Sequence, residues 1–511
     1  MSAPSGDTVE NRDVARGAGL AAVARLGALI EVISQPIYTW LFGVATYGIY
    51  TVLWAAVNII ENVVDLSMTQ ALQRVVPAQG EQGAHAAVKF AILISVIPAI
   101  VLALGITLCA GPIAGLISAA PADRAQLPLA VALFAWALPL WTFVEVSTSA
   151  ARARRAFGPE IRLRIFWEQV ARLIFAIGLF AIGLHSIGLL VAHLLSLLMT
   201  AILSARLLTR YYDARLLIRA PVDARMRRML LASGLALLPT AITRRLFIDL
   251  PPIILNLMLP GSRGATAAGL FGIARKIATV PLIVRQAFQY VLAPLASAQA
   301  AIDRKAIGPL YAFSTRLSVA FVVPMAGLIL LIAADILTLF APEAAAALPL
   351  LLVLVLGRAI EAVVGPATPI VEMIGHRILP LLNSAIGLTA WIILGWLLIP
   401  SQDAMGMAIA VSVGTVLTSW AAMFELRIAD GVTSFDKGSW RSLGIALLGV
   451  VLLALAGFIL TPLGERFRAI SLLLLFWPVL WLVLRFGLSD TDRLALGSAG
   501  RKIGLAGKAL V

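Results

Sequence analysis

The stretch FAILISVIPAIVLALGITLCA, residues Phe90–Ala110, contains no charged side chain. A helix of about 20 apolar residues is long enough to cross the hydrocarbon core of a bilayer. The whole chain has the same character: 61% of its 511 residues are hydrophobic and 13% are charged, with a mean hydropathy of +0.97. Soluble domains average roughly 45–50% apolar and about 25% charged residues. The composition therefore excludes a water-soluble enzyme, a DNA-binding protein and a disordered scaffold, and it predicts a polytopic α-helical membrane protein.

The chain offers about fourteen stretches that are long and apolar enough to cross a bilayer. The predicted spans of the first half are Ala18–Leu41, Tyr47–Met68, Phe90–Ala110, Pro128–Ala150, Ile161–Leu184, Ile187–Leu208 and Met229–Leu257. Those of the second half are Ala265–Leu292, Tyr311–Ala334, Ala345–Val364, Ile378–Pro400, Met405–Leu426, Leu443–Leu460 and Ile470–Phe486. The loops between them are short, which argues against a polysaccharide polymerase or ligase with a large outer catalytic loop.

Basic residues gather in the loops on one side of the predicted bundle. They are Arg152, Arg154, Arg155 and Arg162 after the fourth span, Arg206, Arg210, Arg215, Arg219, Arg225, Arg227 and Arg228 after the sixth, and Arg493, Arg501, Lys502 and Lys508 after the last. The turns on the other side carry few basic residues. Lys and Arg favour cytoplasmic loops, and an even number of spans returns the chain to its starting side. The sequence therefore predicts that both termini are cytoplasmic.

The chain also contains an internal repeat. At an offset of 216 residues, QALQRV at 70–75 aligns with QAFQYV at 286–291, and Pro36 and Gly48 align with Pro252 and Gly264. The matching spans lie six spans apart, so the two copies run in the same direction. This predicts two six-helix lobes related by a parallel repeat, followed by a C-terminal helix pair. The predicted divisions are a tail (1–17), an N-lobe (18–208), a basic linker (209–228), a C-lobe (229–426), the helix pair (443–486) and a basic tail (487–511).

Many charged residues lie inside the predicted spans, where each costs ~2.5–3.5 kcal/mol at mid-bilayer. Three sets have the spacing of ion pairs on one helix face: Glu168 with Arg172, Arg245 with Asp249, and Arg358 with Glu361. The spacing supports a structural pair and a substrate-binding role about equally. Intramembrane carboxylates often bind protons or cations. The candidates for ion coupling are Glu31, Glu61 and Asp249.

A positive excess remains after this pairing, and its members are Arg25, Arg244, Arg275, Lys276 and Arg285. Arg164 and Arg316 lie near span ends, where snorkelling to the interface explains them. Snorkelling does not explain residues more than about two turns deep. A deep cationic cavity suits an anion, and Arg suits phosphate through its paired donors. The excess therefore predicts a cavity for a phosphate-bearing amphiphile.

The sequence carries no motif of a catalytic, metal or cofactor site. The single cysteine excludes an internal disulfide, the four histidines are scattered, and no GxxxxGK[ST] phosphate loop is present. The DxD spacing of sugar-nucleotide sites occurs once, at Asp490-Thr491-Asp492, and we interpret it as the polar start of a helix. We expect no cofactor, no metal, no catalytic residue and no nucleic-acid partner.

Two stretches near the N-terminus carry a family resemblance: WLFGVATYGIY at 40–50 and VDLSMTQALQR at 64–74. They resemble the LGP-x-x-[FY]-G-x-Y and D-x-G-x-x-x-A-x-x-R motifs of the oligosaccharide flippase (Wzx-like) family of the MOP exporter superfamily. Here Phe42-Gly43-Val44 replaces LGP, and Ser67 replaces the glycine of the second motif. The fourteen predicted spans and the short loops extend the resemblance over nearly the whole chain.

The resemblance implies a bacterial inner-membrane transporter. Such flippases move undecaprenyl-pyrophosphate-linked oligosaccharide units to the outer leaflet for O-antigen (lipopolysaccharide) or exopolysaccharide assembly, by alternating access driven by an ion gradient. The resemblance also implies a polysaccharide polymerase and a chain-length regulator as partners. It places six basic residues along the substrate pathway: Arg25, Arg244, Arg245, Arg275, Lys276 and Arg285.

Two alternative functions stay open. A MATE-like drug or metabolite exporter would have about twelve spans and an acidic, aromatic cavity, so the cationic excess and the extra helix pair favour the flippase. A membrane-bound glycosyl- or acyltransferase would need a cluster of carboxylates or histidines at a loop.

Overall fold

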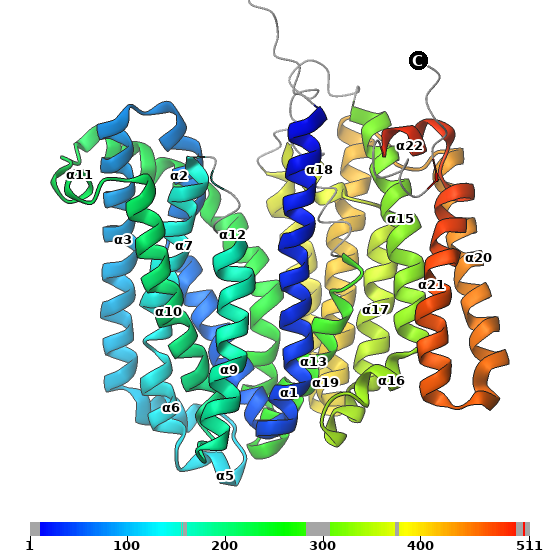
Figure 1. Ribbon diagram of the computed structural model, residues 1–511, viewed down its shortest axis with the longest axis horizontal. Helices are drawn as coiled ribbons and strands as arrows, with labels where there is room; N and C mark the ends of the chain where they lie inside the picture. The colour runs from blue at the N-terminus through cyan, green and yellow to red at the C-terminus, as the bar shows by residue number, and fades with distance from the viewer. Residues whose placement is uncertain are drawn as a thin grey trace, which may run out of the picture.

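The protein is all-helical in its computed structural model, which describes residues 11–154, 156, 161–282, 307–373, 378–496 and 504–505, and no strand occurs in these ranges. The helices of the first half are α1 (Asn11–Val64), α2 (Met68–Val75), η1 (Val76–Ala78), α3 (Glu81–Leu108), α4 (Ala110–Leu116), α5 (Pro121–Arg124), α6 (Leu127–Phe134), α7 (Ala137–Ala153), η2 (Ile161–Trp167), α9 (Glu168–Ala181), α10 (Gly188–Tyr211) and α11 (Ala214–Arg219). Those of the second half are α12 (Ala224–Met258), α13 (Gly261–Ala278), α15 (Gly308–Leu331), α16 (Ala333–Leu337), η4 (Pro342–Ala347), α17 (Leu348–Val363), α18 (Ala367–Met373), α19 (Leu379–Ala429), α20 (Lys437–Leu460), η5 (Thr461–Leu463), α21 (Glu465–Gly487) and α22 (Asp490–Ala495). The predicted all-α fold class is confirmed (Figure 1).

Ten helical segments of the described residues are long and apolar enough to cross a membrane. The helices α1 and α19 are each interrupted once, at Gly43 (φ 80°) and Asp403 (φ 50°). The fourteen predicted spans lie on helical backbone wherever the chain is described, although α13 ends earlier, at Ala278, and short breaks divide some of the others. Helix α1 begins at Asn11, ahead of the predicted start at Ala18.

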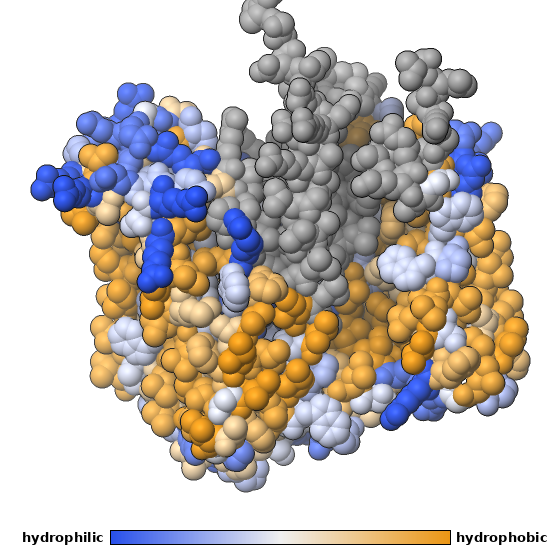
Figure 2. Space-filling view, viewed as in Figure 1, coloured by the Kyte–Doolittle hydropathy of each residue, from blue (hydrophilic) through white to orange (hydrophobic). Residues whose placement is uncertain are grey.

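Large apolar side chains cover the outside of the bundle. Leu108 on α3 is 85% exposed, Phe458 on α20 is 81% exposed and Leu474 on α21 is 68% exposed. Figure 2 shows apolar side chains, in orange, as a broad belt across the left and right parts of the visible face. A surface this apolar needs lipid around it, and the chain is a multi-pass membrane protein.

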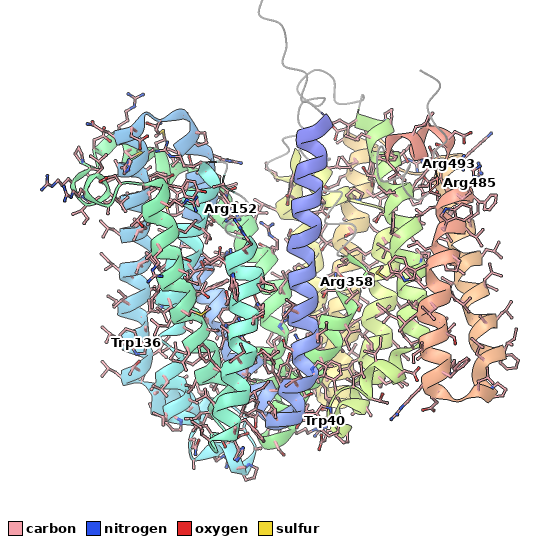
Figure 3. The ribbon with its side chains drawn as sticks, viewed as in Figure 1. Trp40, Trp136, Arg152, Arg358, Arg485 and Arg493 are labelled. Atoms are coloured by element: carbon pink, nitrogen blue, oxygen red, sulfur yellow. The ribbon has the colours of Figure 1, made fainter. Side chains whose placement is uncertain are left out.

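Two helices that carry arginines, α11 with Arg215 and Arg219 and α22 with Arg493, lie at the same end of the bundle. We call the upper end in Figure 1, which carries α2, α11 and α22, the basic face, and the lower end, which carries α5 and α16, the opposite face. Figure 3 shows Arg485 and Arg493 near the basic face and Trp40 near the opposite face. The described start of α1 and the helix α22 both lie at the basic face, as an even number of spans requires.

The helices group into two halves joined along α1. In the first half α3, α7, α9 and α10 pack together, and in the second half α15, α17 and α19 do so, with α20 and α21 packed on α15. Helix α1 contacts α12 and α13 of the second half. A Cβ atom on Gly48 would lie 1.8 Å from the carbonyl oxygen of Ala265, and one on Gly269 would lie 2.3 Å from that of Val44. The backbones of α1 and α13 therefore touch at Gly48 and Gly269.

The segment between the halves packs on the first half. Met226 and Leu230 of α12 join an apolar cluster with Met68, Leu72 and Tyr212. A Cβ atom on Gly234 would lie 2.4 Å from the carbonyl oxygen of Leu66. Because α11 also contacts α3, residues 209–228 are held against the first half, and the connection to the second half runs through the rest of α12.

Both stretches that carry the family resemblance contain backbone positions with positive φ. Gly43 has φ 80°, while Leu66 and Ser67 have φ values of 49° and 56°. Across the turn at Leu66 and Ser67, the side chain of Asp65 accepts hydrogen bonds from the backbone N–H (3.2 Å) and the hydroxyl (3.0 Å) of Thr69. The glycine that the second motif usually carries thus corresponds to a left-handed backbone position.

The C-terminal helix α22 is fixed to α15 by Arg316. This guanidinium donates to both carboxylate oxygens of Asp492 (2.8 and 2.7 Å) and to Asp436 (2.7 Å). Asp492 also forms a capping box with Ser489, so the Asp490-Thr491-Asp492 stretch is a helix start. The head of Arg316 thus reaches carboxylates beyond the end of its span, and α22 supplies one of them.

Candidate functional site

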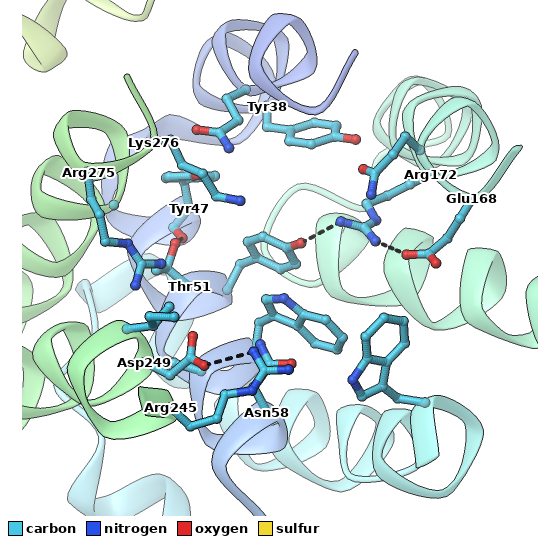
Figure 4. Close-up of a pocket in the computed structure, with 18 of the residues that line it drawn as sticks. Tyr38, Tyr47, Thr51, Asn58, Glu168, Arg172, Arg245, Asp249, Arg275 and Lys276 are labelled. Atoms are coloured by element: carbon cyan, nitrogen blue, oxygen red, sulfur yellow. Dashed lines mark hydrogen bonds and ion pairs between the residues drawn. The ribbon is translucent and has the colours of Figure 1, made fainter. Parts of the chain in front are cut away.

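A cavity of about 510 Å³ lies between the two halves of the molecule. Its described lining comes from α1, α7, η2, α9, α12 and α13, and its residues are Gln35, Tyr38, Tyr47, Tyr50, Thr51, Trp54, Ala55, Asn58, Trp141, Glu145, Arg164, Glu168, Gln169, Arg172, Arg245, Ile248, Asp249, Gly272, Arg275 and Lys276. The charged members are five basic side chains and three carboxylates. Figure 4 shows basic groups on both sides of the cavity.

The wall from the second half is formed by α12 and α13. Arg275 and Lys276 are adjacent in sequence, lie in the last turn of α13 and both line the cavity. On α12, Arg245 Nη1 donates to the carboxylate of Asp249 over 3.3 Å. Asp249 is only 4% exposed, and both members of the pair line the cavity.

The wall from the first half is aromatic as well as charged. Arg172 Nη2 pairs with Glu168 on the same helix face, and Arg172 Nη1 donates to the Tyr50 hydroxyl over 3.2 Å. Behind this pair, the ring of Trp54 packs on buried His193 with centroids 4.3 Å apart. Aromatic rings on this wall offer flat apolar faces with polar edges.

Sequence reasoning missed one charged pair of this wall. Arg164 in η2 donates to both carboxylate oxygens of Glu145 (3.1 and 2.6 Å), and its guanidinium lies 4.6 Å from the ring centroid of Trp141. The prediction that Arg164 snorkels is wrong, because it lines the cavity and has a carboxylate partner there. The available signal was Glu145, a carboxylate inside the predicted span Pro128–Ala150.

The structure separates the predicted site residues into groups. Arg245, Asp249, Arg275 and Lys276 line the cavity, and the pair Glu168–Arg172 does so as well. Arg244 is exposed, and the pair Arg358–Glu361 (2.8 Å) lies on α17 away from the cavity. Glu61 is 3% exposed and is not part of the lining. Arg285 and the side chains of Arg25 and Glu31 lie outside the described residues.

On the side of the opposite face the two halves are held together by polar contacts. Asn256 of α12 is fully buried. Its side chain accepts from the backbone N–H of Ser118 (2.9 Å) and donates to the backbone carbonyl of the same residue (2.7 Å). The Trp40 indole donates to the carbonyl oxygen of Leu339 (2.9 Å). Within the described ranges, no three His, Cys, Asp or Glu side chains are placed to hold a metal ion.

A sequence profile described as polysaccharide biosynthesis protein matches residues 14–299, more than half of the 511-residue chain. The chain belongs to this family. Membership in the polysaccharide biosynthesis family confirms the resemblance drawn from the N-terminal motifs. A search of curated protein sequences gives no match.

Solved structures show the same fold as this member of the polysaccharide biosynthesis family. Lipid II flippase MurJ in an inward closed conformation superposes with a TM-score of 0.70 at 11% identity, over 91% of this chain and 97% of that chain. An inward-facing multidrug resistance MATE family transporter of the MOP superfamily superposes with a TM-score of 0.62 at 13% identity, over 80% and 94% of the two chains. At these identities the similarity is one of fold.

Proposed function

We propose that this protein is a flippase for undecaprenyl-pyrophosphate-linked oligosaccharides in the bacterial inner membrane. It would supply O-antigen or exopolysaccharide assembly, where a polymerase and a chain-length regulator act next. The observation that carries the proposal is the cavity with basic side chains on both walls, in a member of a polysaccharide biosynthesis family. Arginine binds phosphate oxygens through two donors at once, and the aromatic wall offers apolar faces to a sugar.

The charged pairs suggest how an ion gradient would drive this transport. Asp249 accepts from Arg245 at the cavity wall, so protonation of Asp249 would release Arg245 to bind a phosphate. Glu61 and Glu31 are further candidates for the coupling carboxylate. In alternating access, the contacts near the opposite face would break while contacts near the basic face form.

The proposal is tested by flipping of a fluorescent polyprenyl-pyrophosphate oligosaccharide in proteoliposomes. We expect R275A/K276A to slow flipping on the order of 10-fold or more, because a hydrogen bond to a charged group contributes ≈ 1.5–3 kcal/mol. The matched control is R244A, next to the cavity residue Arg245 but exposed outside the lining. A gradient-dissipating ionophore should also stop wild-type flipping.

Equal rates in R275A/K276A and wild type would falsify the role of the cavity. If the protein exports a cationic drug but does not flip the lipid-linked oligosaccharide, the result would support the MATE-like exporter instead. Appearance of a new glycosidic or ester bond in the lipid would support a transferase.

We also propose that the basic face is cytoplasmic, with both termini on that side. The support is the positive-inside rule, applied to the arginines in the loops at this face. A reporter that works only in the cytoplasm should therefore be active when it is fused after Val511. Activity of a periplasm-specific reporter at that position would reverse the orientation.

A further inference from the structure

The short helix α11 is held against α3 at both of its ends. Before its first turn, the backbone N–H of Asp213 donates to Nε2 of buried His85 over 3.0 Å, while Nδ1 of that ring lies 2.7 Å from the carbonyl oxygen of Glu81. At its C-terminal end, Lys89 Nζ donates to the carbonyl oxygens of Ile218 (2.6 Å) and Ala220 (3.1 Å). The segment is therefore a fixed part of the surface.

The two acidic residues of this segment accept hydrogen bonds from backbone N–H groups at helix N-termini. Asp213 caps α11 by accepting from the N–H groups of Arg215 (2.8 Å) and Leu216 (2.9 Å), and Asp223 caps α12 through Met226 (2.7 Å). The backbone N–H groups of Leu216 and Arg215 lower the pKa of Asp213. With both carboxylates used as caps, the arginines supply the outward charge.

The fixed helix presents an unusual mixture of side chains to the outside. Leu217 packs inward against the apolar cluster, whereas Leu216 is 44% exposed and Ile218 is 73% exposed. Arg215 and Arg219 on either side are exposed. Helix α11 projects sideways beyond α3 at the upper left of Figure 1, and Figure 2 shows hydrophilic side chains gathered there directly above the apolar belt.

We propose that α11 is a binding surface for anionic phospholipids in the leaflet at the basic face. Ile218, the more exposed of the two apolar side chains, enters the boundary between headgroups and acyl chains, and Arg215 and Arg219, which share one helix face at i,i+4, bind the lipid phosphates. Apolar side chains interleaved with arginines at the edge of the belt fit a lipid surface, where both kinds of group are satisfied together. Because α11 lies in the segment that connects the two halves, bound lipid would anchor that segment to the bilayer. The proposal depends neither on the cargo nor on which side of the cell the basic face lies.

A dye attached at position 218 tests whether α11 inserts into the bilayer. In full-length protein with Cys109, the single cysteine, replaced by Ser, an environment-sensitive dye is attached to I218C. In liposomes that contain phosphatidylglycerol we expect blue-shifted emission and protection from an aqueous quencher. A dye on V101C, an exposed position of α3, gives the lipid reference, and one on A78C, exposed in η1, gives the water reference. Emission from I218C that matches the water reference in every liposome would overturn the proposal.

The arginines are tested by the affinity of purified protein for phosphatidylglycerol, measured by native mass spectrometry. Each basic residue near an anionic surface contributes a factor of about 5, so R215Q/R219Q should weaken binding about 25-fold. The matched control R427Q/R441Q removes two exposed arginines from the other half of the molecule. Equal binding by the two double variants would contradict the assignment to α11, and equal binding of phosphatidylcholine and phosphatidylglycerol would exclude a preference for anionic lipid.

Discussion

Ser67 holds a backbone conformation that suits glycine better than serine. Its φ and ψ are 56° and 29°, in the left-handed region. A residue with a Cβ atom costs roughly 1–2 kcal/mol there. Its Oγ is buried and has no hydrogen-bond partner among the described residues. The side chain therefore contributes strain without a compensating polar contact.

We expect S67G to raise the free energy of unfolding by about 1 kcal/mol, because glycine adopts the left-handed conformation without steric cost. Thermal unfolding in detergent measures this change. The matched control is S147G, since Ser147 also has a buried, unpartnered Oγ but lies inside helix α7, where glycine costs up to ~1 kcal/mol. The two substitutions should shift the melting temperature in opposite directions. A lower melting temperature in both variants would contradict backbone strain at Ser67.

Helix α22 depends on one cluster of charges at its first turn. Burial opposes ionisation of Asp492, but hydrogen bonds from Arg316 and Ser489 outweigh it and lower its pKa. The pKa of Asp436 is lowered in the same way, against its partial burial, by Ser439 and Arg316. A lowered pKa means that the folded state holds the ionised form more firmly than the unfolded state does.

The cluster predicts a pH dependence with a definite sign. Its stabilisation is complete above the ordinary aspartate pKa of ≈ 3.9 and is lost as the pH falls further, through the lowered values. D492N should cost on the order of 2 kcal/mol at neutral pH, less than the ≈ 3–5 kcal/mol of a fully buried pair, because Asp436 still pairs with Arg316. The control is D490N, whose carboxylate is 88% exposed and should change little. Unfolding curves at pH 7 and below pH 4 measure both, and equal acid sensitivity of D492N and wild type would contradict the assignment.

The helices could be predicted from the sequence more completely than the directions of their side chains. Long apolar runs are nearly unambiguous because a bilayer requires them, and the i,i+4 spacing correctly paired Arg245 with Asp249. Two adjacent arginines on α12 look alike in sequence, yet Arg245 lines the cavity and Arg244 is exposed. Arg164 lies in the π-helical turn η2, and the pattern of apolar residues does not predict such a turn or the way its side chains point. Its partner Glu145 comes from another helix, and sequence spacing carries no information on such contacts.

At the scale of the whole molecule, Asn256 links the two halves near the opposite face. It makes two hydrogen bonds to the backbone of Ser118 across the boundary. At about 1 kcal/mol each, their loss would shift an equilibrium between closed and open forms about 30-fold. N256L should therefore increase access to the cavity from the opposite face.

Labelling of T51C by a membrane-impermeant thiol reagent measures this access, since Thr51 lines the cavity. The background carries Cys109→Ser. The matched control is N383L, because buried Asn383 bonds to Glu425 within the second half and leaves the boundary intact. Faster labelling in N256L alone is the expected result; unchanged labelling would show that Asn256 does not hold the boundary closed.

The three carboxylates of the cavity have a consequence for how long a cargo stays. Glu145, Glu168 and Asp249 already occupy Arg164, Arg172 and Arg245. A phosphate that binds these arginines must displace the three carboxylates, and the carboxylates pair with the arginines again when the phosphate leaves. Such a site exchanges one set of contacts for another, so that loading and unloading differ little in free energy. We expect modest affinity and a short dwell time, as suits a protein that must surrender its cargo in every cycle.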